Sequence, residues 1–261
     1  MATKQTKKGK TGAEFMENPD VIAQELSKGE DFLKKNSALV IGVFVLIFAV
    51  VGGIVGYNYY ISNQNTKAQN EIFQAVYFFE EDAFDQALYG SLDPAEYNTA
   101  QLWETNREEL FQTIEDLGAQ KGFLQIIEEY SGTEAANLAH YYTGIIYMRE
   151  GEFEKALDHL QSFSSDDYLV QARALSLIGD AHMELGNTSE AVKYYNRALD
   201  NNTNKYTSPR YLIKIAVAEE AAGNNAAAIS AYDEIITKYS ESAEFTTARK
   251  HKARLEGLAS K

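Results

Sequence analysis

Few side chains in this sequence have the types and spacing that catalysis or metal binding requires. The four histidines, His140, His159, His182 and His251, form no His-Glu-x-x-His pair, and there is no cysteine to act as ligand or nucleophile. The glycine-flanked serine of a nucleophile elbow is also absent. We interpret His140 and His182 as helix-packing residues, because both fall within a regular pattern of small and large side chains. The sequence therefore predicts no enzyme activity, no metal site and no cofactor.

Carboxylates are abundant but do not single out a site. They occur as neighbours in Glu128-Glu129, Asp166-Asp167 and Glu219-Glu220, and such runs usually lie on solvated helix faces. The formal net charge of the 261-residue chain is −14, and residues 58–261 alone carry −15. A domain this acidic is repelled by nucleic acid and by anionic lipid. We expect no nucleic-acid partner, and without cysteine the domain must be held together by packing alone.

The elements that carry these side chains recur along the chain. A pattern of four positions, separated by three, four and five residues, occurs three times: Gly144, Tyr147, Gly151 and Ala156; Gly179, His182, Gly186 and Ala191; Ala216, Glu219, Gly223 and Ala228. The register repeats after 35 and then 37 residues, which is typical of stacked helix pairs. We expect the first small residue to let paired helices approach closely, the glycine to form the turn, and the alanine to pack at the helix crossing.

This pattern resembles the tetratricopeptide repeat, a helix pair of about 34 residues. The segments YYTGIIYMREGEFEKALDHL and SLIGDAHMELGNTSEAVKYY match its motif, whereas AVAEEAAGNNAAAISAYDEI departs from it at Ala216 and Glu219. The resemblance implies an all-α solenoid with three repeats over residues 137–261. The segment SAEFTTARKHKARLEGL is expected to form the polar capping helix that such solenoids need. A fourth, degenerate repeat is expected around residues 75–87.

In tetratricopeptide repeats the first helix of each pair lines an inner groove, which predicts where a partner would bind. The expected groove positions that could accept apolar side chains are Leu138, Tyr141, Ile145, Met148 and Met183. The Lys, Asn and Arg set with which some co-chaperones of this class hold a carboxyl terminus is missing there, so we do not expect that activity. The alternative is that these five residues are buried between repeats or against the helix that carries Trp103.

One apolar stretch, residues 38–57, predicts a single transmembrane helix. ALVIGVFVLIFAVVGGIVGY has twenty residues with no charge and no proline, and a helix of that length covers about 30 Å, the thickness of a bilayer core. It has no small-residue cleavage site, so we expect a retained anchor. Lys28, Lys34 and Lys35 precede it, whereas Lys67 is the lone basic residue soon after it. This bias predicts a cytoplasmic amino end and an external carboxyl domain.

The segments on either side of the span are predicted as accessory parts. Residues 1–37 combine a basic tail, Met1–Lys10, with a short amphipathic helix that starts near Pro19 and places Leu26 and Leu33 on one face. That helix is expected to lie on the inner membrane surface, to dock on a partner, or simply to lead into the span. Residues 58–136 are predicted as linking helices with an insertion, residues 91–121.

The insertion holds the only tryptophan of the chain, Trp103. Trp103, Leu110, Ile114 and Leu117 recur on one side of what reads as one amphipathic stretch after a break at Pro94.

The order of anchor, linking helices and acidic repeats resembles the YfgM family, ancillary subunits of the bacterial Sec translocon. GFLQIIEEYSGTEAANLAHYYTGIIYMREGEFEKAL is particularly similar to that family's entry into its repeats. The long amino-terminal part and the insertion depart from the family. The resemblance implies a single-pass protein of the bacterial inner membrane, with a cytoplasmic amino terminus and a periplasmic repeat domain.

The same resemblance implies its partners. These are the SecYEG translocon, a membrane-anchored periplasmic prolyl isomerase-like chaperone and nascent exported proteins, with membrane lipid around the anchor. The sequence leaves a scaffold of another envelope complex, for secretion, motility or cell-wall assembly, as the alternative. A hydrolase or metal enzyme on a helical scaffold would need a site that the residues do not provide. An outer mitochondrial import receptor would be expected to carry the missing carboxylate-binding set.

Overall fold

The computed structural model describes residues 19–259, and the predicted basic tail lies outside them. The chain divides into two compact units, Met1–Tyr60 and Ile61–Lys261. All regular secondary structure in the described residues is helical. This confirms the predicted all-α class.

The first unit contains the helix predicted before the span. Helix α2 covers Pro19–Lys35 and ends with Lys34 and Lys35. Helix α3 starts at Ser37 and continues to Glu80 in the second unit. Leu26 and Leu33 of α2 are exposed to solvent, so the apolar face of α2 has no cover within its own unit.

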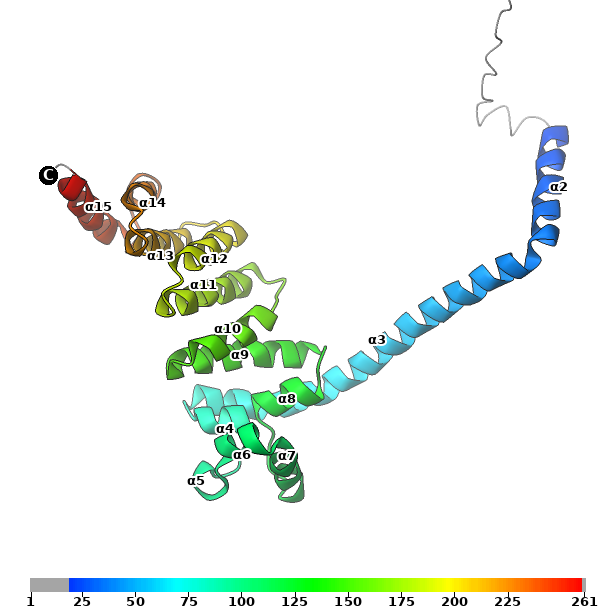
Figure 1. Cartoon of the computed structure of the whole chain (residues 1–261), viewed down its shortest axis with the longest axis horizontal. Helices are drawn as coiled ribbons and strands as arrows, with labels where there is room; N and C mark the ends of the chain where they lie inside the picture. The colour runs from blue at the N-terminus through cyan, green and yellow to red at the C-terminus, as the bar shows by residue number, and fades with distance from the viewer. Residues whose placement is uncertain (1–18, 260–261) are drawn as a thin grey trace, which may run out of the picture. The chain divides into compact units, whose positions relative to one another are not determined.

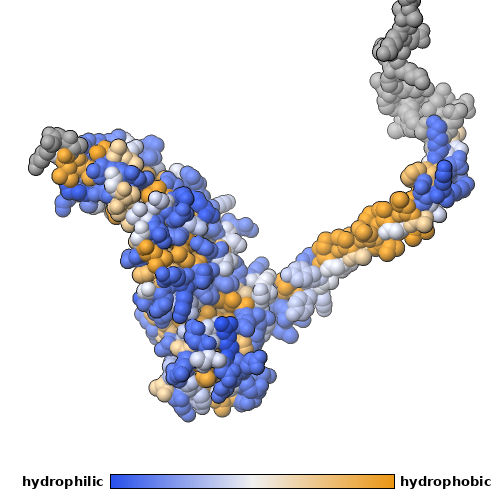
Figure 2. All heavy atoms as spheres, in the orientation of Figure 1, coloured by the Kyte–Doolittle hydropathy of each residue, from blue (hydrophilic) through white to orange (hydrophobic). Residues whose placement is uncertain are grey.

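The first part of α3 is the apolar stretch that the sequence singled out. It is long and apolar enough to cross a membrane, and no residue in its most apolar stretch is buried. Figure 2 shows the hydrophobic side chains gathered along this part of α3. An all-round apolar helix without protein neighbours is stable in lipid, where its backbone groups bond within the helix.

Three helix pairs and a final helix form the repeat region, as Figure 1 shows. The pairs are α9 (Glu134–Glu150) with α10 (Phe153–Ser162), α11 (Tyr168–Glu184) with α12 (Thr188–Asn201), and α13 (Ser208–Ala221) with α14 (Asn225–Lys238). Helix α15, Phe245–Ala259, packs on the last pair through Ala248 and Leu255, both buried. It occupies the place expected of the capping helix.

The turns of the three pairs have one geometry. Gly151, Gly186 and Gly223 have φ of 79°, 75° and 80°, in the left-handed region where glycine has no steric penalty. Each turn ends its helix with backbone N–H groups that bond back to the last turn, for example Asn187 N to the His182 carbonyl at 2.8 Å. The glycine spacing seen in the sequence thus coincides with the ends of the first helices.

The small residues lie where the paired helices cross. A methyl group built on Gly144 would come within 2.5 Å of Leu160 Cγ, and one on Gly179 within 2.4 Å of Tyr195 Cε1. Ala156 and Ala191, on the opposing helices, are fully buried. The bulky residue that follows each alanine therefore fills the space that the glycine leaves free.

A further helix pair with the same offsets precedes these three. On α3, Ala75 is fully buried, and seven residues later, in the turn after the helix ends at Glu80, Asp82 has a φ of 55°. Ala87, fully buried, lies on helix α4, Phe84–Tyr89. This is the geometry of the regular repeats with aspartate in place of the turn glycine, at the position expected for the degenerate repeat.

The second helix of this first pair is interrupted. Helix α4 ends at Gly90, and helix α8, Phe123–Glu129, follows the insertion. The ends of the insertion meet: Ser91 N donates to the Gln120 carbonyl at 2.9 Å, and a methyl group on Gly122 would lie 2.3 Å from the Leu88 carbonyl oxygen. The insertion therefore leaves and re-enters the repeat at nearly one point.

Within the insertion lie α5 (Pro94–Tyr97), α6 (Thr99–Thr105) and α7 (Arg107–Asp116). The prediction of one amphipathic stretch was wrong here, because Asn106 has φ of −155° and its side chain caps α7. Leu110 and Ile114 are buried with Trp103 packed beside them, but Leu117 is exposed. Trp103 therefore still packs on α7 across the break, and Leu117 at the end of α7 is left outside that cluster.

Candidate partner-binding surface

The predicted groove residues divide between burial and exposure. On α9, Leu138 is 37% exposed, whereas Tyr141 is only 9% exposed, and its ring centroid lies 4.9 Å from that of Phe163. Ile145 and Met148 are half-buried against the core around α9. Met183 on α11 packs instead against the core of the last repeats. The spacing places four of the five on one face of α9, and Leu138 offers the most accessible apolar side chain among them.

Two carboxylates on the first helices of the second and third repeats, Asp180 on α11 and Glu220 on α13, already have partners within the chain. Asp180 accepts hydrogen bonds from the Tyr195 hydroxyl at 2.8 Å and from Lys214 Nζ at 2.6 Å. These contacts join the second repeat to the first helix of the third. Burial raises the pKa of Tyr195, and the charge of Asp180 adds to the rise. Asp180 therefore stabilises the stacking of repeats.

Glu220 has the same role at the end of the solenoid. It accepts from the Tyr232 hydroxyl at 2.7 Å, contacts His251 Nδ1 at 3.4 Å and pairs with Arg254 of the capping helix. Burial would raise the pKa of Glu220, but these hydrogen bonds outweigh burial and lower it. The contacts with His251 and Arg254 fix α15 to the third repeat, and the bond from Tyr232 joins the two helices of that repeat.

The sequence interpretation missed two arginines on the same helices. Arg173 and Arg210 each stand six residues before the small residue of their repeat, the position that Leu138 occupies in the first regular repeat. Both are exposed. Burial raises the pKa of Tyr141 and Tyr211, and the charge of Arg173 opposes the rise in both. Aligning the repeats at this position, rather than at the glycines, could have found them.

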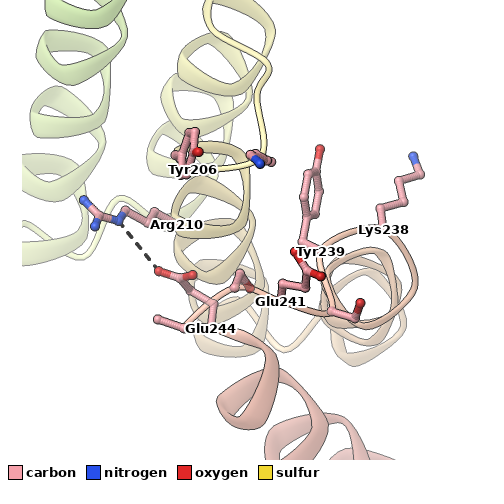
Figure 3. Close-up of a pocket in the computed structure, with 10 residues that line it drawn as sticks. Tyr206, Arg210, Lys238, Tyr239, Glu241 and Glu244 are labelled. Atoms are coloured by element: carbon pink, nitrogen blue, oxygen red, sulfur yellow. Dashed lines mark ion pairs between the residues drawn. The ribbon is translucent and has the colours of Figure 1, made fainter.

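A cavity of about 410 Å³ opens near the end of the solenoid, between the loop before α13 and the loop before α15. Figure 3 shows Arg210 directed toward Glu244, with a distance of 3.7 Å between Arg210 Nε and Glu244 Oε1. Lys238 and Glu241 also line it. Its charges have both signs, so the cavity favours neither an anion nor a cation.

The histidines lie in helix contacts, as expected for two of them. His140 Nδ1 is 3.0 Å from His159 Nδ1 across the α9–α10 pair, and burial lowers the pKa of both, that of His159 to about 4. His182 stacks on Tyr194 at 5.4 Å between ring centroids. Over residues 19–259 no group of three or more metal-ligating side chains comes together.

The model of the tetratricopeptide repeat-like domain family matches residues 30–222, and a tetratricopeptide repeat model matches residues 211–242. The chain belongs to the tetratricopeptide repeat-like domain family. The match begins before α3, so it includes the apolar stretch and the interrupted repeat as well as the regular pairs. Proteins with tetratricopeptide repeats bind other proteins, and this one is accordingly a protein-interaction module.

Two proteins illustrate how far the likeness extends. Lipopolysaccharide assembly protein B of Escherichia coli (strain K12) is 32% identical over 60 residues, which are 23% of this chain and 15% of that protein. The same protein of Escherichia coli O157:H7 matches equally. The crystal structure of MamA aligns with a TM-score of 0.42 at 22% identity, over 56% of this chain and 83% of that one.

Proposed function

We propose that this chain is a membrane-anchored adaptor whose repeat domain holds a protein partner beside the membrane. The observation that carries the proposal is the presence, on one chain, of an uncovered apolar helix and a repeat domain with exposed side chains on its first helices. Attachment to a membrane raises the local concentration of the domain near membrane-bound partners, which strengthens otherwise weak contacts.

The finer proposal concerns place and partners. We propose a bacterial inner-membrane protein with a cytoplasmic amino end and a periplasmic repeat domain, associated with the SecYEG translocon and a membrane-anchored prolyl isomerase-like chaperone. Its support is the lysine bias at the span and the similarity of residues 122–157 to the YfgM family. Emerging exported chains would be further clients.

A second candidate is a scaffold of another envelope assembly. The similarity to lipopolysaccharide assembly protein B favours it, although the alignment spans only 15% of that protein. The two candidates share an anchor and a repeat domain and differ in their partners.

Affinity purification of the tagged full-length chain in mild detergent, with mass spectrometry of the co-purified proteins, distinguishes the two candidates. Translocon subunits with a periplasmic isomerase would support the first candidate. An envelope assembly without translocon subunits would support the second and exclude the first.

The role of the first-helix surface is tested in the same experiment with Leu138→Glu. Leu138 is exposed enough for the charge to reach solvent, so folding should persist while partner recovery falls several-fold. Leu258→Glu on α15, which is also exposed, is the matched control. Equal recovery with both variants would remove the α9 surface from the proposal.

A further inference from the structure

The insertion forms a cleft that the repeat pattern does not explain. Helix α7 and the turn after it form one wall, α8 forms the other, and the volume is about 660 Å³. Phe111 of α7 is half-buried and provides apolar surface, and Glu108 and Glu115 lie on the same wall. Gln125 and Glu129 of α8 face them across the cleft.

The cleft has an excess of negative charge. Its one lysine, Lys121, pairs with Glu129 and, at 3.2 Å, with Glu71 of α3. Burial works to lower the pKa of Lys121, but the two carboxylates outweigh burial and raise it, so this lysine stays charged and paired. Glu108 and Glu115 have no ion-pair partner among the described residues. The uncompensated charge therefore lies on the α7 wall.

The oxygen of one buried amide in the cleft, that of Gln125, accepts no hydrogen bond from the described residues. Gln125 is 3% exposed, and its Nε2 donates to Glu129 Oε1 at 2.6 Å. Because a carboxylate only accepts, the NH₂ group must face Glu129, which fixes the position of the amide oxygen. That oxygen, Gln125 Oε1, has no partner within residues 19–259. Native structures rarely leave a buried acceptor unsatisfied, so this oxygen calls for a donor from outside the chain, which a water molecule or a ligand N–H can supply.

We propose that this cleft binds a lysine or arginine side chain from a basic segment of a partner protein. The methylene groups of such a side chain would pack on Phe111, and its cationic head would lie between Glu108, Glu115 and Gln125 Oε1. A bare metal ion fits less well, since no set of three ligands converges in the described residues. The inference does not depend on the identity of the partners in the proposed function.

The single tryptophan provides the measurement. The ring centroids of Trp103 and Phe111 are 6.0 Å apart, so a ligand that contacts Phe111 should change the tryptophan emission. The full-length chain in detergent is titrated with the peptide acetyl-Ala-Ala-Arg-Ala-Ala-amide and with its citrulline counterpart, which has the same shape without the charge. We expect a saturable change with the arginine peptide that weakens with salt, and at least fivefold weaker binding of the citrulline peptide.

Two variants locate the site. The double substitution Glu108→Gln and Glu115→Gln should weaken binding at least fivefold, whereas Glu96→Gln with Glu154→Gln, the same charge change at exposed residues outside the cleft, should leave it unchanged. Gln125→Leu removes the unsatisfied oxygen, so thermal unfolding should be preserved while binding weakens. Equal loss in the control, no saturable signal, or equal binding of the citrulline peptide would overturn the proposal. Saturation by MgCl₂ or CaCl₂ in place of the peptide would also overturn it.

Discussion

The regular repeats and the interrupted first pair both pack two helices around small buried residues, but they use different residues at the turn. In the regular pairs a glycine makes each turn, and a large side chain fills the space beside a small one. In the first pair Asp82 makes the turn, and an inserted segment divides the second helix into α4 and α8. Both kinds of pair bury small residues at the same offsets, Ala75 and Ala87 in the first pair, which indicates that the fold requires small buried residues there. The residue at the turn and the continuity of the second helix can vary.

The largest predicted change in stability compares a glycine that backbone atoms crowd, Gly122, with one that a side chain crowds, Gly144. A methyl group on Gly122 would meet the backbone of Leu88 and Gly90, which cannot move without opening the insertion. A methyl group on Gly144 would meet the side chain of Leu160, which can change its rotamer. We expect Gly122→Ala to cost about 3 kcal/mol or more and Gly144→Ala about 1–2 kcal/mol.

The measurement is urea unfolding of the full-length chain in detergent, followed by circular dichroism. The double variant Gly144→Ala with Leu160→Val should recover part of the loss. An equal cost at the two glycines would mean that the insertion adjusts as readily as a regular pair.

The second effect concerns the histidine pair of the first regular repeat. In the folded state burial lowers the pKa of His159 from 6.5 to about 4, so between these pH values the residue takes up a proton when the chain unfolds. The free energy of unfolding therefore decreases as the pH falls from about 6.5 toward 4. For His159 alone the loss between pH 7 and pH 5 should be about 2 kcal/mol. Glu220 contributes little to this loss. Its pKa is lowered from 4.5 in the folded state, so the stability that it provides is lost mainly below that pH.

Unfolding free energies at pH 7 and pH 5 test this, and His159→Gln should remove most of the difference. His182→Gln, which leaves the pair intact, should retain it. A wild-type chain with the same stability at both pH values would contradict the burial that we attribute to the pair.

A smaller effect is expected within the last repeat, between α13 and α14. Tyr232→Phe removes the hydroxyl that donates to Glu220 at 2.7 Å. A hydrogen bond to a charged acceptor contributes about 1.5 kcal/mol when partly buried, so thermal unfolding should occur at a lower temperature. Tyr168→Phe, at an exposed tyrosine, is the control and should leave the midpoint unchanged. If the two variants behave alike, the Tyr232–Glu220 bond does not stabilise the last repeat.

The smallest effect concerns the aspartate turn. Asp82 has a positive φ, which costs less for aspartate than for most residues but more than for glycine. Asp82→Gly should stabilise the chain by about 0.5 kcal/mol, after a small loss from its exposed ion pair with Arg149. Gly151→Ala should destabilise it by about 1 kcal/mol. A loss of stability in Asp82→Gly, measured by urea unfolding, would show that the ion pair outweighs the strain.

Much of the fold could be predicted because its signals are local. The offsets among Gly144, Gly151 and Ala156 specify a close helix crossing and a turn within one repeat, without reference to distant residues. The break at Asn106 was missed because a capping side chain can end a helix inside an apolar period. The cleft beside Gln125 was missed because its two walls come from separate helices, which no spacing rule connects.

The sequence by itself determined the helical class, the register of the repeats and the apolar stretch of membrane-spanning length. Each follows from a period of side-chain types along a single helix or helix pair. Only the tertiary structure decided that Tyr141 is buried while Leu138 is exposed, that Asp180 and Glu220 join successive elements, and that Gly90 and Gly122 close the insertion. These outcomes depend on which surfaces meet when helices stack, and packing between distant segments sets that.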